Sequence, residues 1–157
     1  MSVSKQSYLA SLLAQQTAMG AKAINSDAFF IIDGFENEAL LTKQFPWPVL
    51  SPGGEIEVPG PMGTSMFQPQ QVEIKFQGAI SFMETRAGHI DAMLKKILDN
   101  GGIFSARCYE GSIDSPLRTA RITNCFMRIE ALDRDIENRA QILMYTGTLF
   151  GHYVGEA

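Results

Sequence analysis

Two histidines and two cysteines are the residues of this chain best suited to acid–base, nucleophilic or metal chemistry. Cys108 and Cys125 each lie in a segment predicted as a strand, and their spacing does not match that of paired zinc ligands. His89 and His152 are far apart and belong to no recognised zinc or catalytic pattern. We expect two buried free thiols from a reducing cytoplasm, with a disulfide as the alternative, and no metal or cofactor.

Motifs of the common enzyme classes are missing from the sequence. It contains no G-x-S-x-G elbow, no phosphate loop, no dinucleotide-binding glycine pattern after a strand and no H-E-x-x-H. Arg128 and Glu130 lie on one side of a predicted strand and are interpreted as an ion-paired or solvated patch. The sequence therefore favours a protein that is not an enzyme. The alternative, a small hydrolase or oxidoreductase, requires His89 or His152 in a cleft beside a carboxylate.

Composition restricts the class of protein further. A chain of 157 residues with 45% apolar content suits one domain with one core. The net charge of -4 disfavours stable nucleic-acid binding, because phosphate-binding surfaces need clustered Lys and Arg. No segment approaches the roughly 18 to 20 apolar residues of a membrane helix, and residues 1–20 lack the apolar block of a secretory signal. We expect a protein that starts in a cytoplasm and has no membrane partner.

The chain is predicted to have two parts, an N-terminal arm or helix over residues 1–27 and a single β domain over residues 28–157. The arm has few charges, so it can stay loose in a monomer and become ordered on a neighbour. Its moderate helical pattern is formed by Tyr8, Leu9, Leu12, Leu13 and Met19 and stops near Gly20.

Within residues 28–157 the pattern predicts a mainly β fold, an antiparallel β-sandwich or barrel with one packed α-helix. An apolar stripe at spacings of three and four predicts the helix over residues 86–100, which should cover one opening or face of the sheet. Strict alternation predicts an unusually long strand over 71–83. The other predicted strands are 28–32, 40–45, 103–110, 118–132 and 139–154. The strand over 40–45 is expected to pair antiparallel with the strand over 28–32.

A long loop rich in proline and glycine is predicted over residues 46–70. It holds six of the seven prolines, so it cannot be a central strand or a helix. It is also more apolar than a solvated loop, which favours contact with a partner, although folding back over its own core is an alternative. The final strand is apolar on both faces, which also favours a second subunit. The predicted contact residues are Trp47, Val49, Ile56, Val58, Met62, Phe67, Leu149 and Tyr153.

The order of these elements resembles the tail tube protein of contractile-tailed bacteriophages. The resemblance covers about residues 27–155 and lies in layout, with no diagnostic motif. It runs through the loop FPWPVLSPGGEIEVPGPMGTSMFQPQ, the strand QVEIKFQGAISFME, the helix HIDAMLKKILDNGG and the closing strands TARITNCFMRIEAL and RAQILMYTGTLFGHYVG. The tube protein of type VI secretion is similar at this level. A ligand-binding β-barrel that is stable as a monomer is an alternative from another class.

The resemblance implies a structural subunit of hexameric rings whose sheets join into one hollow β-barrel. Rings would stack into a tube in the virion tail, built in the host cytoplasm, through which DNA passes without tight binding. Implied partners are further copies, a tail sheath protein, and tape measure, baseplate or terminator proteins. An acidic bore would let DNA slide. The residues expected to face this lumen are Glu73, Lys75, Gln77, Ser81, Asn124, Arg128 and Glu130.

Overall fold

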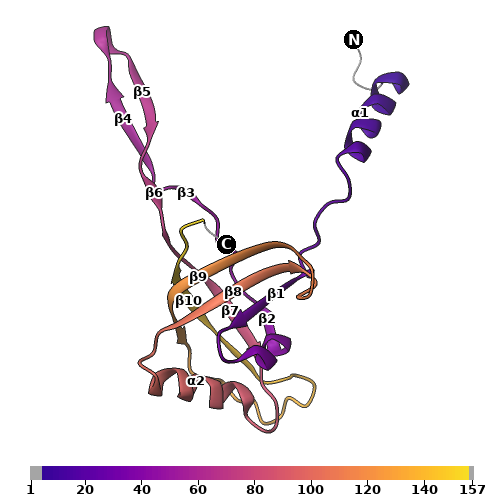
Figure 1. The fold of residues 1–157 in the computed structure, drawn as a ribbon, viewed down its shortest axis with the longest axis vertical. Coiled ribbons are helices and arrows are strands. Elements are labelled where there is room, and N and C mark those ends of the chain that lie inside the picture. The colour runs from indigo at the N-terminus through magenta and orange to yellow at the C-terminus, as the bar shows by residue number, and fades with distance from the viewer. Residues whose placement is uncertain (1–4, 156–157) are drawn as a thin grey trace.

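The fold is mainly β and is described for residues 5–155 by a computed structural model (Figure 1). The outermost residues of the predicted arm and β domain, 1–4 and 156–157, lie outside the described part. The helices are α1 (Gln6–Ala18) and α2 (His89–Asp99), with 3-10 turns η1 (Glu36–Leu41) and η2 (Pro61–Gly63). The strands are β1 (Ala28–Ile32), β2 (Thr42–Gln44), β3 (Ser51–Pro52), β4 (Glu55–Pro59), β5 (Ser65–Pro69), β6 (Val72–Glu73), β7 (Lys75–Met83), β8 (Phe104–Gly111), β9 (Pro116–Ile129) and β10 (Met144–His152).

Six of the strands form one antiparallel sheet in the order β1-β8-β9-β10-β7-β2, which curls into a nearly closed barrel. The rings of Phe30, on β1, and Phe45, just beyond β2, stack with centroids 5.3 Å apart. Strands β1 and β2, at the two edges of the sheet, do not pair with each other, and these stacked rings close the gap between them. This architecture confirms the predicted antiparallel β fold with one packed helix.

Strand β9 belongs to both halves of the barrel. Its first part pairs with β8 and its second part with β10, and in both ladders the register shifts by one residue near Thr123. Asn124 takes a left-handed conformation there, with φ of 49°, as in a β-bulge. The bulge changes which side chains point inward, so Ile122 and Cys125 are both buried while Phe126 is exposed. Simple alternation in the sequence could not show this change.

The core lies inside the barrel and under α2. Its largest fully buried side chains are Phe30, Ile80, Phe82, Ile90, Met93, Ile122 and Leu149. Helix α2 contributes Ile90, Met93 and Ile97, as the predicted stripe requires, but Leu98 of that stripe is exposed. Because Gly88 offers no capping side chain, the Glu84 carboxylate accepts the backbone N–H groups of Ile90 and Asp91 at 3.1 and 3.0 Å. The residue that follows β7 thus holds the start of α2 at this end of the barrel.

Three predicted strands differ clearly from the observed ones. The last begins at Met144 and not at residue 139, because residues 139–143 belong to the connection from β9. Residues 36–41 form η1, because Glu, Ala and Leu favour helical turns and Glu36 and Glu38 suit a helix start. The short β2 that follows pairs with β7, so its predicted pairing with the first strand is wrong. The long strand over 71–83 is interrupted at Ile74, where the chain changes partner from β3 to β10.

The predicted loop over 46–70 contains a β-hairpin, defined here as residues 55–69, in which β4 pairs with β5. The proline argument excluded a central strand, and that exclusion holds, because both strands of a two-stranded ribbon are edge strands. Pro59 and Pro69 close the ends of β4 and β5. The prediction of an irregular loop was wrong because edge strands tolerate missing donors.

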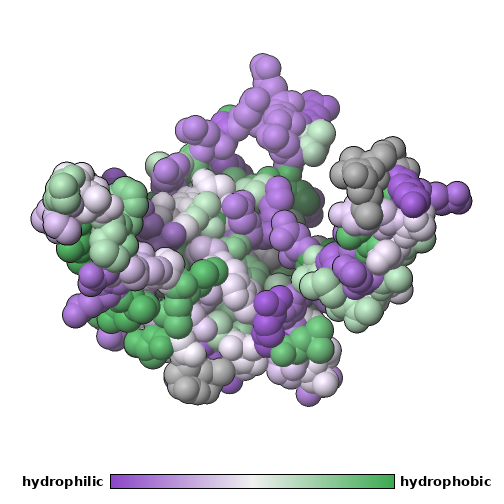
Figure 2. Space-filling view, turned by 90° about the horizontal axis from the view of Figure 1, so that it is seen from above, coloured by the Kyte–Doolittle hydropathy of each residue, from purple (hydrophilic) through white to green (hydrophobic). Residues whose placement is uncertain are grey.

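The hairpin and α1 both project away from the barrel toward the same end of the molecule (Figure 1). Seen from that end, they form two separate lobes, with apolar side chains open to view on the hairpin side (Figure 2). No residue of α1 is buried. Neither helix in residues 5–155 is long and apolar enough to cross a membrane.

Replacing Asn124 tests the bulge in β9. Asn124→Val should lower the free energy of unfolding by about 1–3 kcal/mol, because a β-branched residue is strained at positive φ. Asn124→Gly should be close to neutral, since glycine adopts this conformation freely. Urea unfolding followed by circular dichroism measures both. Equal stability of the two variants would show that the left-handed conformation carries no strain.

Candidate assembly surfaces

The structure disperses the residues that could carry out chemistry. In the part of the chain described, no three or more His, Cys, Asp or Glu side chains are grouped to hold a metal ion. His89 Nδ1 lies 2.5 Å from Thr85 Oγ1, a contact within the turn that begins α2. His152 lines a groove that also includes Glu73, but its buried Nδ1 has no hydrogen-bond partner among residues 5–155. Glu73 instead lies 3.9 Å from the Lys75 ammonium.

Both cysteines are buried free thiols, as expected from the sequence. Burial raises the pKa of Cys108 to about 12 and that of Cys125 to about 11. Thiolates are the reactive form of cysteine, so neither thiol is an activated nucleophile. They act as small apolar core residues.

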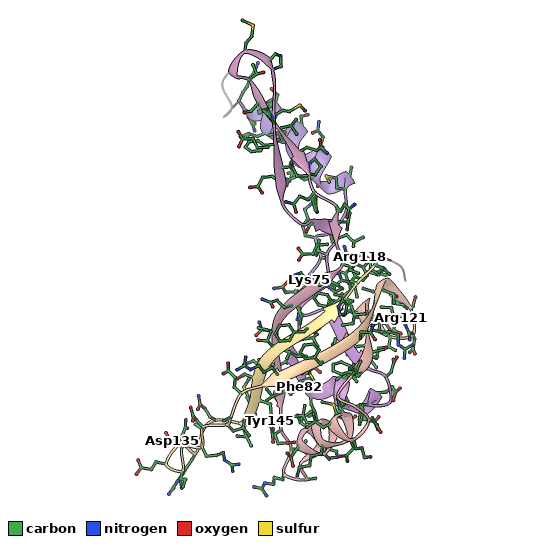
Figure 3. All side chains as sticks on the ribbon, turned by 90° about the vertical axis from the view of Figure 1, so that its left-hand side faces the viewer. Lys75, Phe82, Arg118, Arg121, Asp135 and Tyr145 are labelled. Atoms are coloured by element: carbon green, nitrogen blue, oxygen red, sulfur yellow. The ribbon has the colours of Figure 1, made fainter. Side chains whose placement is uncertain are left out.

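One face of the sheet formed by β9, β10 and β7 is not covered by any other segment of residues 5–155. Register places Arg128, Thr148 and Ala79 in one row across this open face, and Phe126, Phe150 and Gln77 in the next. The bulge in β9 brings Arg128 onto the same face as Gln77. Figure 3 shows Lys75 on β7 and Arg121 on β9 at the two sides of the barrel. Of the residues predicted to face a lumen, Lys75, Gln77, Asn124, Arg128 and Glu130 are exposed on or beside this face, with Glu73 at its edge.

Ser81 is the exception among these residues. It lies on the same side of the sheet as Ala79 and its pairing partner Thr146, but it is only 7% exposed, so it forms little of the open surface. The sequence also gave no sign of the stacked Phe126 and Phe150 rings on the open face, whose centroids are 4.9 Å apart. Phe126 lies two residues before Arg128, and Phe150 lies two residues after Thr148. The sequence could not bring the two rings together because it does not show the strand register or the change of alternation at the bulge.

The open face is nearly neutral. Lys75 and Arg128 supply positive charge, and Glu73 and Glu130 supply negative charge. The expected acidic bore is therefore not seen on these residues. Thr146 and Thr148 add small polar side chains to the same face.

The hairpin exposes several large apolar residues. Met62, at its tip, is fully exposed, Phe67 is 75% exposed and Met66 64% exposed. The tip is held by a Gly60 N–H to Thr64 carbonyl bond of 2.6 Å, with Met62 in the left-handed region. Ile56 is also exposed and Val58 is half-buried; in the described part of the chain no residue of this ribbon is buried.

The other predicted contact residues behave differently. Val49 is exposed, but Trp47 and Tyr153 are half-buried and pack against the core of their own chain. Leu149 is completely buried, so its assignment to an interface was wrong. Its strand is apolar on both faces because one face lines the core and the other carries Phe150 on the open face.

A charged cluster on the outer side of β8 and β9 was missed. Arg107 and Arg121 are directly opposed across the two strands, and Asp33 separates their charges at 3.3 and 3.5 Å. Nearby, Arg118 donates a hydrogen bond to Glu110 and so lowers the pKa of that carboxyl group. These residues lie on different elements, so sequence spacing alone could not group them.

No family model matches the chain, and no curated protein matches it in sequence. Solved structures share its fold. A chain of the sheath–tube complex of an extracellular contractile injection system (PVC, extended state) aligns with TM-score 0.53 and 13% identity, over 87% of this chain and 92% of that one. The anti-feeding prophage tube-terminating cap gives 0.55 and 14%, over 85% and 89%. The 6-fold symmetrised baseplate of the same prophage gives 0.57 and 13%, over 85% and 94%.

These similarities establish the fold: the chain has the fold of components of contractile injection systems. The sequence had predicted a resemblance to contractile-tail tube proteins, and the structural neighbours agree with it. The complexes that contain them are structural assemblies and not enzymes.

Thiol reactivity tests the buried state of Cys108 and Cys125. In native protein at neutral pH neither should react with a thiol-specific chromogenic reagent, and both should react in denaturant. Because the folded pKa values lie above the unfolded value of 9.0, the stability from keeping these thiols neutral is present below about pH 9 and is lost as pH rises toward 11 to 12. Rapid labelling of native protein would contradict the buried assignment.

Proposed function

We propose that the chain is a self-assembling structural subunit of a contractile tail-type particle. In this proposal six copies form a ring, rings stack into a tube, and the open sheet face lines the lumen. The similarity to chains of a sheath–tube complex, a tube cap and a baseplate supports a role in such an assembly. The 6-fold symmetry named for the baseplate supports the number of copies.

The observation that carries the proposal is the lack of cover on the projecting elements. A two-stranded hairpin is marginally stable alone in water, and so is an isolated helix as short as α1. Both nevertheless extend from a barrel whose own core is complete, and both expose apolar side chains. Copies of the chain that cover each other's hairpins and arms would remove this exposure. The exposed residues Val49, Ile56, Met62 and Phe67 are the proposed contacts.

The shape of the subunit supports the lumen assignment. A continuous barrel built from several copies must use strand edges that one copy leaves unpaired. Only residues Phe82 and Ser81 of β7 pair with β2, so most of that edge is free within residues 5–155. Joining such edges would turn the open face with Gln77 and Arg128 toward a common axis. Glu73, Lys75, Asn124 and Glu130 would lie at the same bore.

The proposed partners are further copies, a sheath protein outside the tube, and terminator, baseplate and tape measure proteins at its ends and inside it. The particle would be assembled in a host cytoplasm. Passage of DNA through the bore is one version of this role. The extracellular injection systems among the neighbours favour a second version, a tube without a genome. Nuclease-protected DNA in purified particles distinguishes the two.

Removing the hairpin tests its role in stacking. Replacing residues 53–71 with Asn-Gly would join Pro52 to Val72, which already pair, through a two-residue turn. The variant should keep the free energy of unfolding within about 0.5 kcal/mol, as expected for exposed residues, yet form no stacked tubes by negative-stain electron microscopy. Leu98→Ser, which changes an exposed apolar residue on α2, is the matched control. Tubes of normal length from the shortened variant would reject the role.

Cysteine labelling tests the lumen assignment. Gln77→Cys and Arg128→Cys should react quickly with a polymer-linked maleimide in isolated subunits, and several-fold more slowly in tubes, because the polymer cannot enter the bore. Lys96→Cys on the exposed side of α2 should stay reactive in both states. The native thiols do not interfere, since both are buried. Undiminished labelling of Gln77→Cys in tubes would place this face outside the lumen.

A further inference from the structure

Helix α1 stands clear of the barrel and has no charged face (Figure 1). Residues 6–21 contain no Asp, Glu, Lys or Arg. A helix on the surface of a soluble protein normally turns charged or polar side chains toward water and apolar ones toward a core. Here no residue of the helix is buried, although Leu9, Leu12 and Leu13 are apolar. The described part of the chain therefore leaves α1 without the cover that its composition requires.

The side chains of α1 form two unlike faces. Residues four positions apart lie one above the other on a helix. The bulky face carries large apolar side chains, those of Tyr8, Leu9, Leu12, Leu13 and Met19. The small face carries short side chains, those of Ser7, Ala10, Ala14 and Ala18. At about 100° per residue, Leu9 and Ala18 point in opposite directions, so the two faces lie on opposite sides of the helix.

The polar side chains of α1 are compatible with apolar neighbours on both faces. Thr17 Oγ1 donates a hydrogen bond of 2.9 Å to the Leu13 carbonyl, so this hydroxyl is satisfied within the helix. Ser11 and Gln15 lie at one border between the two faces, where they keep contact with water. Gln16 is the polar member of the bulky face, and it lies in the last turns, where unpaired carbonyl groups offer partners for its amide.

Two faces of different shape require two neighbours. A pair of helices related by a two-fold axis would bury the same face of each helix and leave the opposite face open. Packing the bulky face of one copy on the small face of the next uses both faces of every helix, and large side chains opposite small ones allow close packing. A contact of this kind is heterologous, and it closes into a ring when the rotation between copies permits.

The connection to the barrel lets α1 reach an adjacent copy. Residues 19–27 join the helix to β1 and contain no helix or strand. Nine extended residues span at most about 30 Å, which exceeds the roughly 20 Å length of a helix of this size. The helix can therefore pack beside that of a neighbouring copy while each barrel keeps its place.

We propose that the α1 helices of adjacent copies pack side by side, bulky face on small face, and form a closed collar around the hairpin end of one ring. The inference rests on the proposed function for the ring, but the contact between two helices does not require it. A helix of 13 residues is marginal alone in water, and the collar supplies the cover that stabilises it. This contact joins copies within one ring and is separate from both the barrel and the hairpin.

A disulfide trap tests the collar. Leu12 and Ala14 lie on opposite faces of α1 at nearly the same height, so the proposed contact brings Leu12 of one copy close to Ala14 of the next. In the double variant Leu12→Cys/Ala14→Cys, mild oxidation should give a ladder at multiples of 17.3 kDa on a non-reducing gel, ending at six copies. Each single variant should stay monomeric, because like faces do not meet. Strong dimers from a single variant would indicate two-fold pairing and overturn the inference.

Leu12→Cys/Met19→Cys is the matched control. Both positions lie on the bulky face, two turns apart, which is too far for a disulfide within one helix. This variant has the same number of added thiols as the test variant but should give no ladder. The native thiols are buried and should not contribute.

An added charge gives a second readout in the double-cysteine variant. Ala10→Glu places a carboxylate inside the proposed contact and should reduce the ladder several-fold. Gln15→Glu adds the same charge at the border beside Ser11 and should leave the ladder unchanged. Both changes should keep the urea midpoint of the barrel, because no residue of α1 is buried. Equal ladders from the two charged variants would contradict the packing of the small face.

The outcomes separate the collar from the proposed function. If tubes form but the double variant gives no more ladder than the Met19 control, the collar is wrong and the proposed function stands. A ladder that continues past six copies in protein that forms rings would link different rings and also overturn the collar. If the unmodified chain forms no rings, the proposed function and the closed collar both fail, and a ladder specific to the double variant would then support the helix contact alone.

Discussion

The fold depends on one strand that pairs in two halves of the barrel. Strand β9 leaves β8 and joins β10 where the extra residue at Asn124 interrupts the ladder. Without that extra residue, the outward and inward positions of its second half would be exchanged, because side chains alternate across a strand. Arg128 would then point into the core and Met127 toward solvent. The identity of the open face is therefore set by a single backbone irregularity.

The core is complete within one chain, so the apolar residues of the hairpin and α1 are not needed to form it. Phe30 and Phe45 close the barrel, Glu84 fixes α2 to it, and the large apolar side chains inside are fully buried. The hairpin and α1 add nothing to this core. In the proposed assembly these apolar residues form the surface for association, since burying them is worth roughly 25 cal/mol per Å². Folding and the proposed association would thus use separate parts of the sequence.

The sequence predicted the β class, the packed helix and the buried thiols because each depends on a local pattern. The stripe through Ile90 and Ile97 needs only the helical period, and it places the same residues in the core. The burial of Leu149 and Ser81 was missed because it depends on which strands lie beside β10 and β7. The hairpin was missed for a different reason. Proline density argues against a central strand but says nothing about a ribbon that has only edges.

The hairpin and the arm leave the barrel at the same end, and this gives the subunit a direction (Figure 1). In the proposed assembly, a column of such subunits would have two unlike ends, because only one of them presents free hairpins. Initiation and termination of growth would then need different complementary surfaces. The protein that covers the hairpin end would differ from the protein that binds the opposite end. Polarity of this kind would let an assembly control its length at one end while staying anchored at the other.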